Sequence, residues 1–151
     1  MLIILEGCDG SGKSTLAKKL AAMLDATVIH CTTSTPNNKE FFEKIVRASK
    51  KKNIIADRFC YGQFVYQKPK DRPLGSLEEL HNLEIKMIKA GAKVIFVTAP
   101  NEILEKRLAS RGETPINNLS TAEIEIKFRE LLSKESLMGD SIIEWNTGGA
   151  Q

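Results

Sequence analysis

Short apolar runs alternate with amphipathic segments along the whole chain. Five runs of four or five residues are mainly aliphatic and are typical of buried strands, at 2–5, 27–30, 53–56, 94–97 and 141–145. Helical periodicity fills most of the intervals between them. Strands that alternate with helices predict an α/β domain, a five-stranded parallel sheet with helices on both faces. At 151 residues, we expect one domain over 1–151.

The helices are indicated by apolar spacing and by capping residues. Ser76 and Ser120 are each followed by a glutamate three residues on, which is the capping-box signature of a helix start. Gly91 marks the end of the helix that Ser76 opens. The predicted helices are 13–24, one around 41–46, one near 61–66, 77–88, 101–110 and 121–135.

Candidate chemistry gathers where the predicted strands end. Gly7, Asp57, Thr98 and Asn146 each follow or close an apolar run. In an open parallel sheet, ligands bind at the carboxyl ends of the strands. The sequence therefore predicts one ligand site along this edge.

Residues 7–14, GCDGSGKS, match the P-loop pattern GxxxxGK[ST] at every fixed position. Glycines let successive backbone N–H groups curl around a phosphate, and the following helix directs its positive end at the anion. Lys13 is expected to reach the β- and γ-phosphates and Ser14 to bind Mg²⁺, so ATP and Mg²⁺ are the predicted cofactors. The expected ATP-binding residues here are Gly7, Asp9, Gly10, Ser11, Gly12, Lys13, Ser14 and Thr15.

Asp57 and Arg58 close the third strand beside this loop. A carboxylate at that position is suited to order Mg²⁺ or its waters, so Asp57 joins Ser14 as a predicted metal residue. The planar guanidinium of Arg58 is suited to grip a phosphate with two parallel hydrogen bonds. A structural salt bridge at a strand end is the alternative.

Three segments in order resemble the thymidylate kinases. Residues 6–15, EGCDGSGKST, resemble their EGxDGxGKST opening. Residues 57–59, DRF, with Tyr66 and Gln67, resemble their DR[YF]…YQ segment, and residues 104–111 resemble their arginine-bearing helix and lid. The resemblance implies a nucleoside monophosphate kinase of the P-loop superfamily, with a lid at about 107–120.

The resemblance also implies where the catalytic cations lie. Some thymidylate kinases carry an arginine inside the P-loop, where this chain has Gly10. The chain is similar to the members whose arginine comes from the lid, which makes Arg107 and Arg111 candidates and Arg129 a weaker third. The expected catalytic residues are Lys13, Arg58, Arg107, Arg111 and Asp9.

The remaining site residues follow from the same resemblance. Asn146 and Thr147 occupy the place where related kinases hold adenine. The expected acceptor-binding residues are Asp9, Phe42, Arg47, Arg58, Tyr66 and Gln67. For Phe42, placement in the core is the alternative, since apolar residues on helices usually pack inward.

The predicted function is ATP- and Mg²⁺-dependent phosphoryl transfer to a nucleoside monophosphate, dTMP or a related pyrimidine nucleotide. The chain is shorter than typical thymidylate kinases, and residues 32–37 replace the arginine-glutamate-proline-glycine segment that helps these enzymes bind the acceptor. A deoxynucleoside kinase acting on a neutral nucleoside, or a non-catalytic P-loop protein, are the alternatives. His30 and His81 are expected to be structural or exposed.

Composition limits the partners and the setting. The net charge is only +3 and forms no basic stripe, so we expect no stable nucleic-acid complex. The three cysteines show no CxxC spacing and are expected to be reduced, which favours a cytoplasmic protein. Without an apolar run of about 20 residues, no membrane span is expected. A homodimer remains open.

Overall fold

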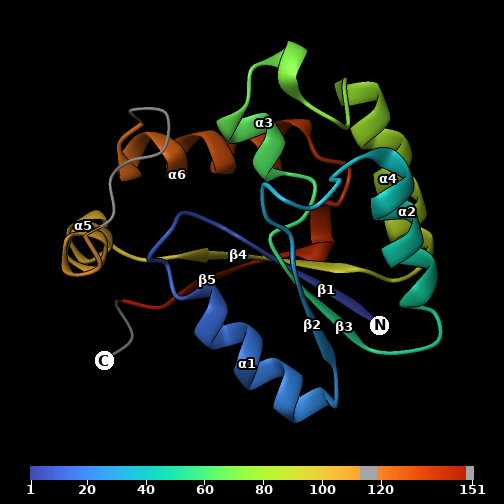
Figure 1. The fold of residues 1–151 in the computed structure, drawn as a ribbon, viewed down its shortest axis with the longest axis horizontal. Helices are drawn as coiled ribbons and strands as arrows, with labels where there is room; N and C mark the ends of the chain where they lie inside the picture. The colour runs from blue at the N-terminus through green and yellow to red at the C-terminus, as the bar shows by residue number, and fades with distance from the viewer. Residues whose placement is uncertain (113–118, 149–151) are drawn as a thin grey trace.

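A computed structural model describes residues 1–112 and 119–148, and its centre is a five-stranded parallel sheet (Figure 1). The strands are β1 (Leu2–Glu6), β2 (Thr27–His30), β3 (Ile54–Asp57), β4 (Lys93–Thr98) and β5 (Ile142–Asn146). They lie in the order β2-β3-β1-β4-β5, and every pairing is parallel. The predicted fold class is confirmed, with each strand within two residues of its expected bounds.

The two faces of the sheet are covered unequally. The described α-helices are α1 (Lys13–Leu24), α2 (Lys39–Ala48), α3 (Gly62–Tyr66), α4 (Leu77–Lys89), α5 (Asn101–Ser110) and α6 (Thr121–Glu130), and short 3-10 turns lie at Pro69–Asp71 and Gly139–Ser141. Helices α2, α3, α4 and α6 lie over one face, whereas α1 lies on the other (Figure 1). The larger core lies under the four helices and the smaller one between α1 and the sheet.

Side-chain caps fix the starts of three helices. The Oγ atoms of Ser76 and Ser120 accept the backbone N–H groups of Glu79 and Glu123, at 3.3 and 3.2 Å. Asn38 accepts the N–H of Phe41 at 2.9 Å in the same way. Such a cap satisfies one of the N–H groups that a helix start leaves without an intrahelical partner. The two predicted serine caps are therefore confirmed.

The helix predicted to run to about residue 135 changes its winding near its end. Helix α6 stops at Glu130, and Leu131–Glu135 form a wider π-helical turn. Leu131 and Leu132 are both buried in the main core. The predicted helical segment thus continues to Glu135, but its last turn is wider than an α-helical one.

The described chain contains no helix that combines the length and the apolar character needed to cross a bilayer.

Candidate active site

The loop between β1 and α1 has the backbone geometry of a phosphate cradle. Gly7, Gly10 and Gly12 have φ angles of +147°, +83° and +100°, which residues with a Cβ rarely adopt. Gly12 lies directly before the first turn of α1. The N-terminus of this helix thus faces the loop, where its backbone N–H groups and its dipole favour an anion.

Gly7 also leaves no room for a side chain. A Cβ there would lie 2.3 Å from the backbone oxygen of Val97 on β4. We expect Gly7→Ala to lower the free energy of unfolding by about 2–4 kcal/mol, since a backbone carbonyl cannot move aside and the φ angle is unfavourable. Urea denaturation measures this. Gly91→Ala is the matched control: Gly91 also has a positive φ (+74°), but a Cβ meets nothing within 4 Å, so a loss of only about 1 kcal/mol is expected. Equal losses in the two variants would contradict the steric argument.

Lys13 is the buried cation of this loop. Its side chain is 6% exposed, and its Nζ donates hydrogen bonds to the backbone oxygens of Gly7 and Cys8, both at 2.9 Å. Burial lowers the pKa of Lys13 to about 8, and the nearby Arg58 adds to the decrease, against the opposing charges of Asp9, Asp57 and Glu6. An anion bound in the loop would stabilise the charged form of this lysine.

A small cavity of about 120 Å³ opens at the mouth of the loop. Its walls come from the P-loop, the start of α1, the end of β3 and the end of α5. The lining residues are Asp9, Gly10, Gly12, Lys13, Ser14, Thr15, Asp57, Arg58 and Arg111. We refer to it as the donor cavity. Arg111 is the predicted lid arginine that reaches it.

Ser14 and Asp57 both line the donor cavity and are hydrogen-bonded to each other. The Oγ of Ser14 donates a hydrogen bond to Oδ2 of Asp57 at 2.9 Å, and Nδ1 of His30 lies 3.2 Å from the same oxygen. Mg²⁺ prefers oxygen ligands, a carboxylate or hydroxyl among them, and usually completes its shell with phosphate oxygens and water. These two side chains fit that requirement, so they would hold Mg²⁺ together with a bound phosphate.

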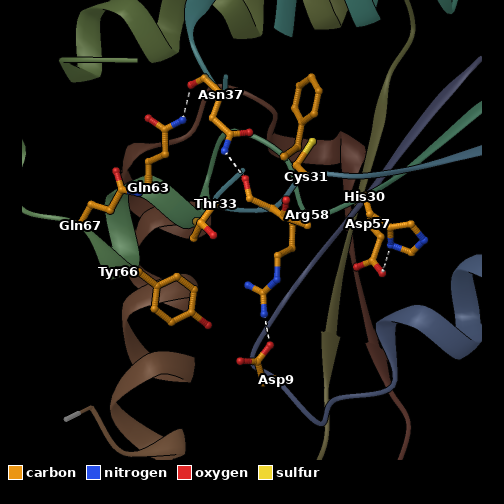
Figure 2. Close-up of a pocket in the computed structure, with 13 residues that line it drawn as sticks. Asp9, His30, Cys31, Thr33, Asn37, Asp57, Arg58, Gln63, Tyr66 and Gln67 are labelled. Carbon is orange, nitrogen blue, oxygen red and sulfur yellow. Dashed lines mark hydrogen bonds and ion pairs between the residues drawn. The ribbon is translucent and has the colours of Figure 1, made fainter. Parts of the chain in front are cut away.

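A larger cavity of about 400 Å³ lies on the side of the sheet that α2, α3, α4 and α6 cover (Figure 2). Its walls are the ends of β2 and β3, the loop that follows β2, and α3. The lining residues are Asp9, His30, Cys31, Thr32, Thr33, Asn37, Asp57, Arg58, Phe59, Gly62, Gln63, Tyr66 and Gln67. We refer to it as the acceptor cavity.

Asp9, Asp57 and Arg58 line both cavities and therefore mark their junction. Figure 2 shows the guanidinium of Arg58 reaching toward Asp9, with which it forms an ion pair. The ring of Tyr66 lies 5.5 Å from the Arg58 guanidinium carbon. Burial alone would lower the pKa of Arg58, but Asp9, Tyr66 and Glu6 outweigh it and raise the pKa, so this arginine stays charged.

The wall opposite the junction is held by Gln63. Its Nε2 donates to the backbone oxygen of Asn37 at 2.5 Å, and its Oε1 accepts the N–H of Leu74 at 2.9 Å. Asn37 in turn donates from its amide to the backbone oxygen of Thr32 at 2.7 Å (Figure 2). These bonds fasten the 32–37 loop to α3. The side-chain amides of Gln63 and Asn37 thus shape the cavity through bonds within the protein.

Gln67 differs from these two amides. Its Oε1 is buried, and the part of the chain that the structure describes offers it no hydrogen-bond donor. A buried polar atom without a partner is costly, and a ligand can supply the missing bond. Gln67 lines the acceptor cavity from the end of α3 (Figure 2), and its Oε1 has an unused capacity to accept a hydrogen bond.

Two expected acceptor residues lie away from the acceptor cavity. Phe42 is fully buried in the main core, where its ring packs 4.6 Å from that of Phe59, and only Phe59 lines the cavity. Arg47 is exposed on α2 and pairs with Glu43 one turn before it. The two residues lie on different faces of α2. Phe42 belongs to the apolar face, which packs on the core, and Arg47 belongs to the polar face, which is exposed to solvent.

Arg107 and Thr147 brace the P-loop from outside the donor cavity. Arg107 Nη1 donates to the backbone oxygen of Gly10 at 2.7 Å and to Thr147 Oγ1 at 3.2 Å. Thr147 is itself hydrogen-bonded to the backbone oxygens of Ser11 and Thr98. Asn146 accepts the N–H of Gly148 at 3.0 Å. The last strand is thereby tied to the loop, and Arg107 is engaged in that tie.

Arg129, the weaker candidate, is also engaged elsewhere. It pairs with Glu144 on β5 and lies over the ring of Phe96. The predicted lid at 107–120 falls partly on residues 113–118, which lie outside the described residues.

Sequence reasoning missed several residues of the acceptor cavity. His30, expected to be structural or exposed, is exposed, and it also lines the cavity beside Asp57. Cys31, Thr32, Thr33, Asn37 and Gln63 carry no motif, although the 32–37 segment stands in place of a missing family motif. Its position after a strand end is the signal that could have found them.

The three cysteines are free and buried. Burial raises the pKa of Cys8 to about 11 and of Cys31 to about 12, and it also raises that of Cys60. A thiol with a raised pKa is a poor nucleophile, so none of them is a candidate for covalent catalysis.

Comparison with known proteins gives matches along the whole chain. A family model described as an AAA domain matches residues 1–108. The SPbeta prophage-derived uncharacterized protein YorR of Bacillus subtilis (strain 168) is 36% identical over 97% of this chain and 89% of its own length. A crystal structure of B. subtilis YorR in complex with phosphorylated GDP has a TM-score of 0.79 at 34% identity, covering 99% of this chain and 87% of that one.

More distant structures share the fold. A thymidylate kinase from Candida albicans has a TM-score of 0.59 at 18% identity, covering 99% of this chain and 84% of the kinase. A deoxyadenosine kinase from M. mycoides gives 0.57 at 16% identity, covering 96% and 89%. At these identities the likeness concerns the fold alone. The chain thus has the fold of the nucleotide and nucleoside kinases, and by the family match over its first 108 residues it belongs to the AAA-domain family of P-loop NTPases.

Proposed function

We propose that the protein transfers the γ-phosphoryl group of Mg²⁺-bound ATP to a nucleoside monophosphate. The observation that carries this proposal is the junction of the two cavities at Asp9, Asp57 and Arg58. Phosphoryl transfer needs donor and acceptor in line across such a junction, with cations beside the moving group. A cavity of about 400 Å³ next to the P-loop offers the acceptor a place of its own.

The proposed roles follow from the positions of the side chains. Lys13 contacts the β- and γ-phosphates, and Ser14 and Asp57 hold Mg²⁺, which neutralises charge on the phosphates when bound. Arg58 gives up part of its ion pair with Asp9 and binds the acceptor phosphate. Arg111 approaches the transferred phosphoryl group from the end of α5.

The acceptor base is proposed to be a pyrimidine, read by Gln67. A carboxamide presents a donor and an acceptor side by side, which matches the adjacent N–H and oxygen on the edge of thymine or uracil. The phosphorylated GDP bound by YorR, a relative at 36% identity, makes guanine nucleotides the next acceptors to test. Asn146 and Thr147 are proposed to lie near the donor base.

A coupled assay of ADP release from ATP and Mg²⁺ tests the proposal. The acceptor panel contains dTMP, dUMP, dCMP, dAMP, dGMP, their ribonucleotide counterparts, GDP, thymidine and deoxycytidine. Turnover on a monophosphate is expected, with the highest kcat/KM on a pyrimidine. Turnover on nucleosides alone, or none on the whole panel, would refute the proposal.

A deoxynucleoside kinase is the second candidate, and the position of Asp57 favours it. A neutral hydroxyl acceptor needs a carboxylate as general base, and Asp57 lines both cavities at their junction. The same carboxylate is held by Ser14 and faces His30, so a role as base would compete with its role toward Mg²⁺. The two nucleosides in the panel decide between the candidates.

The pKa of Lys13 predicts how ATP binding depends on pH. Because that pKa is about 8 in the free protein, Lys13 loses its charge as the pH rises through 8, and the phosphates lose their buried cation. We expect Mg-ATP to bind about tenfold more weakly at pH 9 than at pH 7. Isothermal titration calorimetry measures the affinities. In Lys13→Met the binding should be weak and equal at both pH values; an unchanged affinity of the wild-type protein would contradict the prediction.

A further inference from the structure

Arg58 is held in an unusual backbone conformation. Its φ angle is +66°, in the left-handed region that residues with a Cβ rarely occupy. The backbone N–H of Arg58 still belongs to the sheet, since it donates to the oxygen of Leu5 at 2.9 Å. The chain therefore turns out of the sheet at Arg58 itself, and something must hold the turn against its intrinsic cost.

Glu6, the last residue of β1, supplies that hold. It is fully buried, and its Oε2 accepts two backbone N–H groups, from Phe59 at 3.2 Å and from Tyr61 at 3.0 Å. These groups lie one and three residues after Arg58, so one carboxylate oxygen binds the turn on its C-terminal side. Tyr61 is also the residue from which α3 starts.

The buried carboxylate lies among cations as well as N–H donors. Burial raises the pKa of Glu6, whereas Arg58, Lys13 and the two N–H groups act to lower it. Its other oxygen, Oε1, is buried and finds no hydrogen-bond donor within the described ranges. Of the two carboxylate oxygens of Glu6, Oε2 is therefore the one that binds the turn.

We propose that Glu6 is the positioning residue of this site: its carboxylate locks the 58–61 turn, which directs the Arg58 guanidinium to the junction of the two cavities. The same lock fixes the start of α3, which carries Tyr66 and Gln67 into the acceptor cavity. Glu6 itself lines neither cavity. The part of this inference that concerns acceptor binding rests on the proposed function.

The test compares Glu6→Met with Glu6→Gln. Methionine keeps the volume and removes both acceptors, so we expect the amides of Phe59 and Tyr61 to exchange with solvent at least tenfold faster in hydrogen-exchange NMR. KM for the monophosphate acceptor should rise at least tenfold, while KM for ATP stays within about twofold. Glutamine keeps one acceptor oxygen, so Glu6→Gln should remain close to wild type in both measurements.

Glu84→Met is the matched control for the loss of a buried glutamate. Glu84 is also fully buried, and it accepts hydrogen bonds from Tyr61 Oη at 2.7 Å and from the N–H of Leu137 at 3.0 Å. This variant should lose stability without a selective change in the acceptor KM.

Two results would overturn the inference. In the first, the amides of Phe59 and Tyr61 exchange no faster in Glu6→Met than in the wild-type protein. In the second, these amides do exchange faster, but kcat and the KM values for both substrates are either unchanged or altered to the same extent. A failure of the proposed function is distinguishable, because it appears in the wild-type protein as no turnover on any acceptor. The hydrogen-exchange arm still decides whether Glu6 holds the turn in that case.

Discussion

Lys13→Met is expected to lower kcat for phosphoryl transfer by about a thousandfold while leaving the fold intact. The ammonium group is buried at the mouth of the P-loop, with its hydrogen bonds directed to two backbone oxygens of the loop. No second lysine lines the described part of the donor cavity. In Lys13→Met, no lysine would therefore remain in the described part of the cavity to stabilise the negative charge on the transferred phosphoryl group.

The fold should survive this change because Lys13 contributes charge rather than packing to the core. Its lowered pKa indicates that burying the ammonium is itself unfavourable, and methionine fills a similar volume without that cost. Circular dichroism checks the fold and the coupled assay measures kcat. Lys18→Met, an exposed lysine on the same helix, is the control and should keep full activity. A Lys13→Met enzyme with near-normal turnover would refute the assigned role.

The parts of the site that sequence predicts are those set by short-range chemistry. The P-loop combines a strand, glycines at required backbone angles and a helix start, all within a few residues. The ends of parallel strands share one edge, so the strand pattern predicts that Asp57 lies on the same edge as the P-loop, and the pairing of β3 with β1 makes the two neighbours. Serine caps are equally local, which is why the predicted starts of α4 and α6 are correct.

The parts that sequence could not predict depend on which face of a helix is turned toward the core and on hydrogen bonds between residues far apart in the sequence. Phe42 looked suitable for stacking on a base, but its helix turns it behind Phe59. Arg107 and Arg111 are one turn apart, and only contacts with Gly10 and Thr147 reveal that Arg107 braces the P-loop. Nothing in the sequence indicates that an oxygen of Glu6 meets N–H groups more than 50 positions away.

The loop that stands in place of the missing family motif forms part of the wall of the acceptor cavity. The resemblance led us to expect an arginine-bearing segment after β2, and the chain has a polar loop there instead. That loop is fastened to α3 through Gln63 and Asn37. Besides Arg58, no lysine or arginine lines the described part of the cavity. Under the proposed function, Arg58 is therefore the one arginine or lysine among the described lining residues that can bind the acceptor phosphate.

Arg58→Lys should therefore have a large effect although it conserves the charge. A guanidinium can form two parallel hydrogen bonds to one phosphate, and the guanidinium carbon of Arg58 lies 5.5 Å from the centroid of the Tyr66 ring. Lysine offers a point charge on a more flexible stem. We expect kcat/KM for the acceptor to fall about a hundredfold, equivalent to ~2.7 kcal/mol, with ATP binding nearly unchanged.

Arg47→Lys is the control that distinguishes the acceptor site indicated by the cavity from the one implied by the family resemblance. Family resemblance places Arg47 at the acceptor, whereas the structure leaves it exposed on α2 and paired with Glu43. Its replacement should leave kcat/KM unchanged, measured in the same steady-state assay. If Arg47→Lys were as damaging as Arg58→Lys, α2 would have to move toward the acceptor during turnover. If neither variant changed kcat/KM, the acceptor phosphate would have to bind elsewhere, and the assignment of the two cavities would fail.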